Sequence, residues 1–562
     1  MKTIIKNISL FNMSGWDINV VIKVLLITGI ILINFTLLVG DLKIGEYGGI
    51  DSYGISGLLS IFIFLIVIIF GLQNRKTYKY AYIGICYLVL IFFIPQIFAK
   101  LPIFPYVYRV YGHIDYIIHT GHINPENPGL CYQTWPGAMF LGAVLEIVTK
   151  LGVYILLTLP VLRYLIIVPL IYLLIRGLTN NTSHAILGTM FFIISFYGFN
   201  WFVPGGLAFL IEMIGIYILF RICYLKKNEN FLKFGVILML LTGILVFTHF
   251  LTSIFWMVTI IDFLILSMFI IKNKRFQEIS VLLLLLFVIF QFYWLFGHMC
   301  SINLFKQRLN DLICLPKATE SVEKWTAVAQ SGVTPHAKVL GLKMYFVYSV
   351  IGISLIGMLI VLAESLKRFF KTRKVDRLVL LLLLLLVSYS LAVPAIVGAY
   401  SGEIAARLFG VIRYILVIFV TLALKNAKFR RALIVTLFVF SYLSILCTYG
   451  NMTYDYVEPN EVTGIFYTSA NIQSKFYTIP DALWDIKYLT KKWQYILPIG
   501  SLNLENAEDN IIILSSRRIE GYKFFTGKDL NIIDIKIKSS KIYCSDNYYM
   551  NVPSKFEIYY GG

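Results

Sequence analysis

The sequence predicts a polytopic α-helical membrane protein of about thirteen transmembrane helices, with a small extracytoplasmic α/β domain at its C-terminal end. Of the 562 residues, 59% are hydrophobic and only 14% are charged. A soluble chain has roughly 45–50% apolar and about 25% charged residues. The mean hydropathy is +0.79. Apolar runs of about 20 residues, long enough to span a bilayer, recur from Val20 to Thr448 between short basic patches.

The apolar runs give the expected helices. They cover residues 18–40, 57–73, 79–98, 152–175, 184–200, 203–222, 234–250, 252–271, 279–297, 343–363, 377–394, 408–424 and 432–449. The first run is followed by no small-residue cleavage site, so it is expected to be a retained helix and not a signal peptide. Basic residues in short loops mark the cytoplasmic side. A cytoplasmic N-terminus places every basic patch on that side and the C-terminus outside, in a plasma membrane.

The net charge of +19 does not indicate a nucleic-acid partner. Residues 450–562 carry 13 acidic and 12 basic side chains, so the excess belongs to the membrane part. There it follows the short cytoplasmic loops, where basic residues orient a membrane protein. The charge is therefore explained by membrane orientation; membrane lipid is an expected partner of the protein, and nucleic acid is not.

Two domains are expected. Residues 1–449 form the membrane domain, with extracytoplasmic loops at 99–151 and 298–342, and residues 450–562 form the outer C-terminal domain. The tail alternates apolar and polar residues in NIIILSS and NIIDIKIKSS, a pattern typical of strands, with a helix expected at 481–495. In the first loop, residues 107–120 and 138–152 are expected to form two amphipathic helices lying along the membrane surface.

The first loop also holds the densest cluster of titratable groups, in YGHIDYIIHTGHINPENPG at residues 111–129. If 112–122 is helical, Asp115, His119 and His122 share one face at i, i+4 and i+7. Such a set could bind a divalent cation, Mg²⁺ or Mn²⁺, or could hold a carboxylate base with its hydrogen-bond partners. The alternative is a polar face that meets only water and headgroups. Three neighbouring ligands on one helix rarely close a metal site unaided.

The segment DYIIHTGHINPENPGLCYQTWPGAMFLGAVLEIVTKLG resembles the first extracytoplasmic loop of GT-C glycosyltransferases, especially of archaeal members. An Asp followed by His and then a Tyr-x-x-Trp-Pro-Gly stretch is typical of them, and Tyr132 and Trp135 match that stretch. His249, in THFLTS, is similar to their His-x-Leu-Thr element. The tail stretch SSKIYCSDNYYMNV resembles their C-terminal ends.

The resemblance implies an activity. GT-C enzymes transfer a sugar from a polyprenyl-phosphate or polyprenyl-diphosphate carrier to a glycan, lipid or protein acceptor on the outer face. By analogy with the family's first-loop aspartate, Asp115 is expected to be the general base, worth about 10²–10⁴-fold in rate. His119 or His122 is expected to orient that carboxylate or to bind a metal. Substrate contacts are expected from Tyr132, Trp135 and His249.

The leaving phosphate requires positive charge near the outer surface. Arg407 and Arg413 lie in SGEIAARLFGVIRY, where the chain enters the twelfth helix from outside, and both are candidates. Glu403 and Arg407 are spaced i, i+4, so a simple ion pair is the alternative. For Arg413 the alternative is snorkelling or a buried pair.

Other functions stay open at this stage. The Trp-Trp-Asp-Tyr-Gly motif of oligosaccharyltransferases is absent from the tail, which argues against that activity. A polysaccharide polymerase or ligase, a lipid or solute transporter, and an envelope scaffold are the rival interpretations. An outer cavity lined by Asp115, His119 and Arg407 would favour an enzyme. A midplane cavity lined by the intrahelical Arg163 and Asp262 would favour transport.

Overall fold

The structure is a computed structural model. It describes residues 17–45, 47–99, 102–103, 106–124, 133–152, 155–195, 203–225, 231–271, 274–296, 302, 335–397, 404–450 and five strands between 476 and 561.

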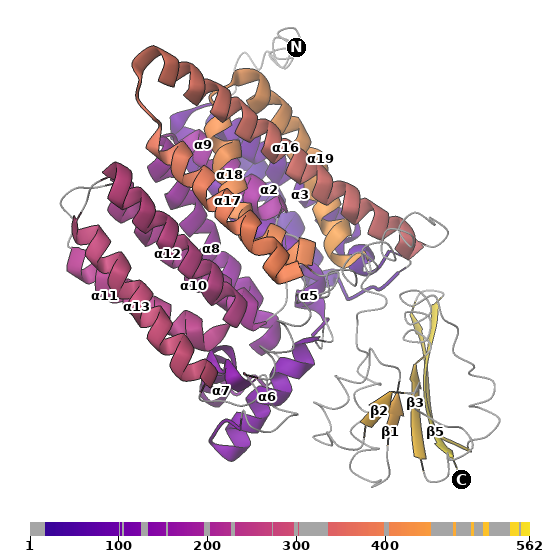
Figure 1. The fold of residues 1–562 in the computed structure, drawn as a ribbon. Coiled ribbons are helices and arrows are strands. Elements are labelled where there is room, and N and C mark those ends of the chain that lie inside the picture. Colours follow the sequence, from indigo (N-terminus) through magenta and orange to yellow (C-terminus); the bar gives the residue numbers. More distant parts are fainter. Residues whose placement is uncertain are drawn as a thin grey trace.

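Helices form almost all of the described chain up to residue 450 (Figure 1). The α-helices are α2 (Ile18–Val39), α3 (Gly54–Gly71), α4 (Tyr78–Phe92), α5 (Ile94–Phe98), α6 (Tyr106–Thr120), α7 (Gly137–Thr149), α8 (Ile155–Thr179), α9 (Thr182–Ser195), α10 (Pro204–Phe220), α11 (Phe231–Thr248), α12 (Phe250–Leu266), α13 (Lys274–Phe296), α16 (Pro335–Thr372), α17 (Arg377–Val397), α18 (Ile404–Ala423) and α19 (Ala427–Tyr449). Short 3₁₀ helices lie at Gly49–Tyr53 and Arg75–Thr77, and π-helical turns follow α10 at Arg221–Leu225 and α12 at Ser267–Ile271.

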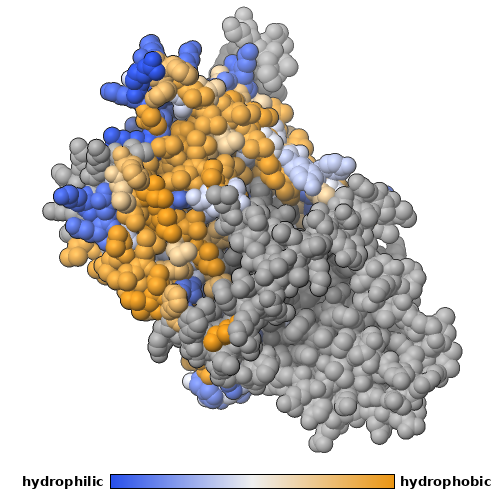
Figure 2. Space-filling model, viewed as in Figure 1, coloured by the Kyte–Doolittle hydropathy of each residue, from blue (hydrophilic) through white to orange (hydrophobic). Residues whose placement is uncertain are grey.

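The predicted class, a polytopic α-helical membrane protein, is confirmed. Seven helices of the described chain are long and apolar enough to cross a membrane. Shorter apolar helices, among them α9 and α11, accompany them. Figure 2 shows apolar side chains covering the flank of the bundle, with hydrophilic ones gathered at its end. Each of the predicted segments overlaps an observed helix. The number of crossings and the direction of the termini stay predictions.

Two elements differ from the sequence-based expectation. The segment expected as one helix at 79–98 is broken at Phe93 into α4 and α5, where Pro95 cannot donate the hydrogen bond that an uninterrupted helix needs. The segment expected at 343–363 is much longer. Helix α16 begins eight residues earlier, at Pro335, and ends nine residues later, at Thr372.

Hydrogen bonds between helices engage one oxygen of each of two carboxyl groups inside the bundle, those of Glu212 and Asp262. The hydroxyl of Tyr389 in α17 donates to Oε1 of Glu212 in α10 at 3.5 Å and lies 3.0 Å from the hydroxyl of Tyr414 in α18. On the same helix as Tyr389, Ser388 donates to Oδ1 of Asp262 in α12 at 2.8 Å. Since an unsatisfied carboxyl in a bilayer is costly, these bonds give α10, α12, α17 and α18 defined neighbours.

The five strands of the tail form one mixed sheet. They are β1 (Phe476–Thr478), β2 (Ile496–Pro498), β3 (Asn510–Ser515), β4 (Ser540–Tyr549) and β5 (Val552–Gly561), in the order β2-β1-β3-β5-β4. β1 pairs in parallel with β2 and β3, whereas β5 pairs antiparallel with β3 and β4. The strands lie within the predicted tail domain. Its boundary near residue 450 stays a prediction, and the helix expected at 481–495 lies outside the described residues.

The bundle has two different ends. Figure 1 shows α6 and α7 at the end opposite the turn that joins α16 to α17. The start of α12 also lies near α7, because Phe250 packs against Trp135 and Thr248 lies against Gly137. The start of α10 lies beside His249, which directly precedes α12. The candidate active site lies at this α6–α7 end.

Candidate active site

The predicted amphipathic helices of the first loop are present as α6 and α7. They run antiparallel, because Ile114 of α6 meets Gly142 of α7 while Tyr111 meets Glu146. A methyl group at Gly142 would collide with the Ile114 side chain, whose Cγ1 lies 2.9 Å from that position. Glycine at this position therefore lets the two helices approach closely enough for their polar residues to meet.

Asp115 and His119 form the first part of the site. His119 Nδ1 lies 3.1 Å from Asp115 Oδ1 and 2.9 Å from the Asp115 backbone oxygen. The Asp115 side chain is 19% exposed and that of His119 is 63% exposed. The i, i+4 spacing predicted this neighbourhood, and the imidazole lies beside the carboxylate while both groups remain accessible to solvent.

Glu146 brings a second carboxyl group to the same place. The Tyr111 hydroxyl donates to Glu146 Oε1 at 3.4 Å. Partial burial raises the pKa of Glu146, the Tyr111 hydrogen bond and His119 counteract this, and the negative charge of Asp115 raises the pKa further. Burial, followed by the charges of Glu146 and Asp115, raises the pKa of Tyr111 to about 12. Tyr111 therefore remains a hydrogen-bond donor at physiological pH.

Sequence reasoning missed Glu146, although a signal was present. It is the only charged residue within AMFLGAVLEIVT, where every other position is apolar or a small or hydroxyl-bearing residue. A lone carboxyl group in an apolar helix at a membrane surface is costly unless it has a partner. The sequence could not name that partner, because Tyr111 is 35 positions away on another helix.

His122 does not share the helix face that the sequence predicted. α6 ends at Thr120, and Gly121 adopts the left-handed conformation with φ of 73°. The His122 ring then packs against Tyr116, with centroids 6.0 Å apart, and its Nδ1 lies 2.9 Å from the Thr120 oxygen. Within the described chain no group of three or more His, Cys, Asp or Glu side chains is arranged to hold a metal. Mg²⁺ or Mn²⁺ binding by Asp115, His119 and His122 stays a prediction.

The two family-like motifs meet at the junction of α11 and α12. His249 caps α12, its Nδ1 accepting the Thr252 backbone N–H at 3.3 Å and lying 2.9 Å from the Thr252 hydroxyl. Trp135, just before α7, packs its ring 5.7 Å from Phe250. Gly137, the first residue of α7, lies against Thr248, with its Cβ position 2.6 Å from Oγ1. Tyr132 lies outside the described residues.

A buried guanidinium group lies at the N-terminus of α10. Arg163 of α8 is 7% exposed, and its Nη1 occupies the space where Gly206 would carry a Cβ. Its Nε and Nη2 have no hydrogen-bond partner among the described residues. The neighbouring Gly205 has its Cβ position 3.4 Å from His249 Nε2. The N-terminus of a helix carries partial positive charge, so this region favours an anion.

Arg413 of α18 is also buried, at 2% exposure. It lies within electrostatic range of Tyr164, as does Arg163, whose guanidinium carbon is 5.5 Å from the Tyr164 ring centroid. Arg413, the cation that the sequence placed within the membrane, therefore lies inside the bundle and near Arg163. Arg407 belongs to α18, but its side chain is not described, and Glu403 lies outside the described residues.

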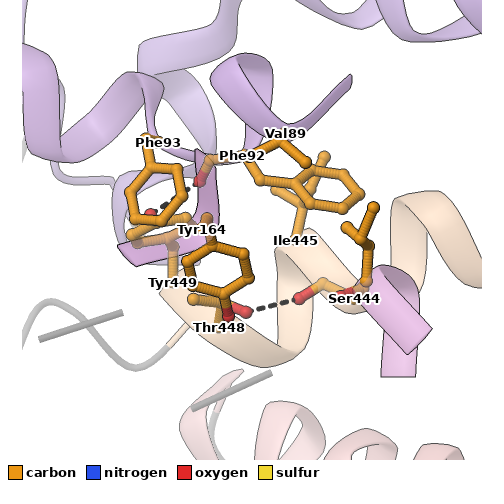
Figure 3. Close-up of a pocket in the computed structure, with 9 residues that line it drawn as sticks. Val89, Phe92, Phe93, Tyr164, Ser444, Ile445, Thr448 and Tyr449 are labelled. Carbon is orange, nitrogen blue, oxygen red and sulfur yellow. Dashed lines mark hydrogen bonds between the residues drawn. The ribbon is translucent and has the colours of Figure 1, made fainter. Parts of the chain in front are cut away.

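A pocket lies next to these arginines, between α4, α8, α9 and α19 (Figure 3). Its walls are mainly apolar and aromatic, with Tyr164 on one side. Tyr449 closes another side by donating to the Phe92 oxygen at 2.7 Å. None of the residues predicted for the site lines this pocket. The outer cavity shared by Asp115, His119 and Arg407 stays a prediction.

Comparison with known proteins gives structural similarities only. No protein-family model matches the chain, and no curated protein is similar to it in sequence. The oligosaccharyltransferase of Archaeoglobus fulgidus in its apo form is similar with a TM-score of 0.47 and 11% identity, over 82% of this chain and 73% of that one. ArnT from Cupriavidus metallidurans, bound to undecaprenyl phosphate, is similar with a TM-score of 0.37 and 10% identity, over 86% and 98%.

Both TM-scores lie below 0.5, so neither similarity assigns a function to this chain.

Proposed function

We propose that this protein is an integral membrane glycosyltransferase. It takes a sugar from a polyprenyl-phosphate or polyprenyl-diphosphate carrier and transfers it to an acceptor hydroxyl on the extracytoplasmic face. The observation that carries the proposal is the pairing of Asp115 with His119 at 3.1 Å, in a carboxyl cluster that also contains Glu146. A general base must be accessible to its substrate and held in position, and a solvent-accessible carboxylate beside an imidazole meets both requirements.

In the proposed reaction, Asp115 accepts the proton of the acceptor hydroxyl while that oxygen attacks the anomeric carbon of the sugar. The bond between the anomeric carbon and the carrier phosphate oxygen breaks, and the electron pair leaves with the phosphate. His119 stands beside the carboxylate, with Nδ1 3.1 Å from Asp115 Oδ1 and 2.9 Å from the Asp115 backbone oxygen. General-base assistance of this kind is worth about 10²–10⁴-fold in rate.

The carrier phosphate is assigned to Arg163 and Arg413. Both guanidinium groups are buried, where a charge is stabilised by an opposite charge and hydrogen bonds. Arg163 has donors without partners among the described residues and points at the first turn of α10. Helix N-termini bind phosphate readily. The sequence predicted Arg413 as a phosphate ligand. Arg163 is proposed as a second ligand because it lies beside Gly206, at the start of α10.

The site has two parts connected by α7. Glu146 lies nine residues after Gly137 along α7, which corresponds to about 13 Å of helix. Gly137 in turn contacts Thr248, next to His249, and His249 borders Gly205. An extended ligand with a phosphate at one end and a reacting sugar further out fits this arrangement. The pocket found in the described chain is lined neither by Arg163 and Asp262 nor by the residues predicted for the outer site, so it favours neither transport nor transfer.

The test is transfer by the purified full-length protein from a panel of labelled polyprenyl-phosphate and polyprenyl-diphosphate sugars. Asp115→Asn is expected to lower kcat by about 10²–10⁴-fold with little change in KM for the donor. Glu278→Gln is the matched control, because Glu278 is an exposed carboxylate near the start of α13. An Asp115→Asn variant that transfers sugar at the wild-type rate would remove the proposal. A wild-type protein that uses none of the donors would remove it as well.

A further inference from the structure

One exposed apolar stripe on α16 is longer than a bilayer requires. It includes Tyr345, Tyr348, Leu359, Leu366 and Phe370, which are 56–73% exposed and spaced so that they share one helix face. Phe370 follows Tyr345 by 25 positions, or about 37 Å of helix. The hydrocarbon core is only about 30 Å thick. The stripe is therefore long enough for Leu366 and Phe370 to reach the level of the lipid headgroups.

Basic side chains accompany the stripe where it leaves the hydrocarbon. We call residues 366–377 the basic end of α16. It contains Lys367, Arg368, Lys371, Arg373, Lys374 and Arg377, against one acidic residue, Asp376. Lys367 and Lys371 directly follow the two outermost apolar residues, Leu366 and Phe370. The segment thus has an apolar face and an adjoining cationic face.

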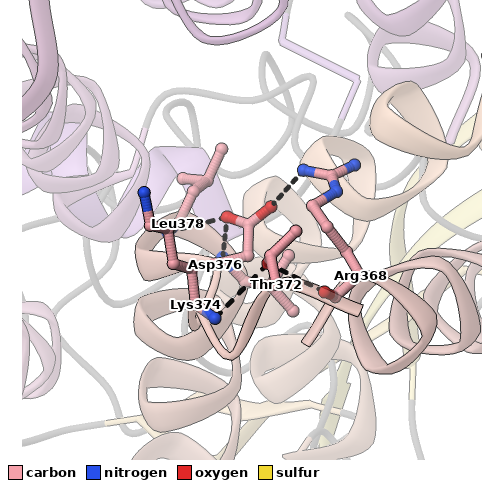
Figure 4. A network of polar contacts seen from close by, with 6 residues as sticks. Arg368, Thr372, Lys374, Asp376 and Leu378 are labelled. Atoms are coloured by element: carbon pink, nitrogen blue, oxygen red, sulfur yellow. Dashed lines mark hydrogen bonds and ion pairs between the residues drawn. The ribbon is translucent and has the colours of Figure 1, made fainter. Parts of the chain in front are cut away.

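Hydrogen bonds fix the turn that presents these cations (Figure 4). Arg368 Nη1 lies 3.3 Å from Asp376 Oδ2, and the other oxygen of Asp376 accepts the backbone N–H of Leu378 at 3.2 Å. The Thr372 hydroxyl donates to the Arg368 oxygen at 2.9 Å. The single acidic residue of the segment is therefore used to hold the turn, and Lys367, Lys371 and Lys374 remain exposed around it.

We propose that the basic end of α16 binds anionic phospholipid headgroups of the leaflet from which the helix emerges. An apolar stripe with adjoining Lys and Arg is the pattern of membrane-surface binding. Each cation near an anionic surface strengthens such binding several-fold. A soluble acidic partner would match the charge, but it would not account for an apolar stripe continuous with the lipid-facing side of α16. The basic end lies opposite α6 and α7, so this inference is independent of the proposed sugar transfer (Figure 1).

The test uses the full-length protein in nanodiscs that contain photoactivatable phosphatidylglycerol or photoactivatable phosphatidylcholine. Mass spectrometry maps and counts the crosslinks at residues 366–377. The triple variant Lys367→Gln, Lys371→Gln, Lys374→Gln removes three cations and leaves the Arg368–Asp376 pair intact. The control Lys425→Gln, Lys428→Gln, Arg430→Gln removes the same charge from the turn between α18 and α19 and from the first turn of α19. Thermal melting checks that both variants are folded.

We expect the wild type to be labelled by phosphatidylglycerol well above phosphatidylcholine. The triple variant is expected to lose about tenfold of the phosphatidylglycerol labelling, and the control variant to keep it. Equal labelling by the two lipids would overturn the proposal. Unchanged phosphatidylglycerol labelling of the triple variant would also overturn it, as would an equal loss of labelling in the control variant. The same holds if inorganic phosphate, at the concentration of the lipid, abolishes the labelling of the wild type.

Discussion

Tyr111 of α6 donates a hydrogen bond of 3.4 Å to Oε1 of Glu146 in α7. This bond brings a second carboxyl group beside Asp115, and partial burial together with the Asp115 charge raises the pKa of Glu146. A carboxyl whose pKa is higher in the folded than in the unfolded state binds protons more strongly when folded. The folded state is therefore favoured at low pH, and this advantage is lost as the pH rises from the ordinary Glu range through the raised pKa.

The first prediction follows from that sign. Glu146→Gln keeps an acceptor for Tyr111 and removes the ionisation, so its Tm relative to wild type should increase as the pH rises above about 4.5, the ordinary Glu value. Melting curves from acidic to neutral pH measure this difference. Glu278→Gln should show no such trend, because Glu278 is exposed. A wild type that gains Tm over Glu146→Gln with rising pH would contradict the assignment.

The second prediction concerns the close approach of α6 and α7. Gly142→Leu should push α7 away from Ile114 and separate Glu146 from Asp115, lowering transfer activity by about tenfold or more, since misplaced catalytic groups lose rate steeply. Ile114→Ala provides space for the new side chain. The double variant Gly142→Leu, Ile114→Ala should therefore recover part of the activity, giving a coupling energy of about 0.5–3 kcal/mol in a double-mutant cycle. Strictly additive effects would show that the contact does not position the site.

The third prediction compares two adjacent glycines of α10. A methyl group at Gly206 would occupy the place of Arg163 Nη1, whereas one at Gly205 would lie at an ordinary contact distance of 3.4 Å from His249 Nε2. Gly206→Ala should displace the guanidinium and raise KM for the carrier substrate by about tenfold, as the loss of one charge-assisted hydrogen bond would. Gly205→Ala should stay near wild type, and Arg163→Ala should reproduce the Gly206→Ala effect. An unchanged KM in both Gly206→Ala and Arg163→Ala would remove Arg163 from the phosphate site.

The fourth prediction concerns the hydroxyl network inside the bundle. Tyr389→Phe removes the donor to Glu212 and the contact with Tyr414, so it should destabilise the protein by about 1–3 kcal/mol. Glu212→Leu replaces a buried carboxyl by an apolar group and should be tolerated much better. Tyr345→Phe, at a side chain that is 73% exposed, is the control for loss of a hydroxyl. Thermal melting in detergent measures all three, and an unchanged Tm in Tyr389→Phe would contradict the role of the network.

The helices of the bundle were largely predictable because the bilayer imposes a local rule. A segment that spans hydrocarbon must be apolar over about 20 residues and must satisfy its backbone internally. Each helix expected in the bundle therefore overlaps an observed one, and α6 and α7 were predicted by their shorter, interrupted apolar patterns. Helix ends were less predictable. α16 continues to Thr372 through a charged sequence, because helix formation does not stop where hydropathy does.

The site was predictable only in its local part. The i, i+4 spacing of Asp115 and His119 indicated their contact, because neighbours on a helix face are fixed by the helix itself. The same rule failed for His122, because α6 ends at Thr120. The contacts of Glu146 with Tyr111 and of Arg163 with Gly206 join separate helices. No periodicity in the chain encodes them.

The sequence by itself therefore determined the class of protein, the approximate place of its helices and one catalytic candidate pair, since these depend on hydropathy and helical spacing alone. The tertiary structure decided which helices meet, through glycines such as Gly142 and Gly206 that allow close approach. It also decided which buried charges come together, because the energy of a charge in a bilayer depends on partners that are distant in the chain.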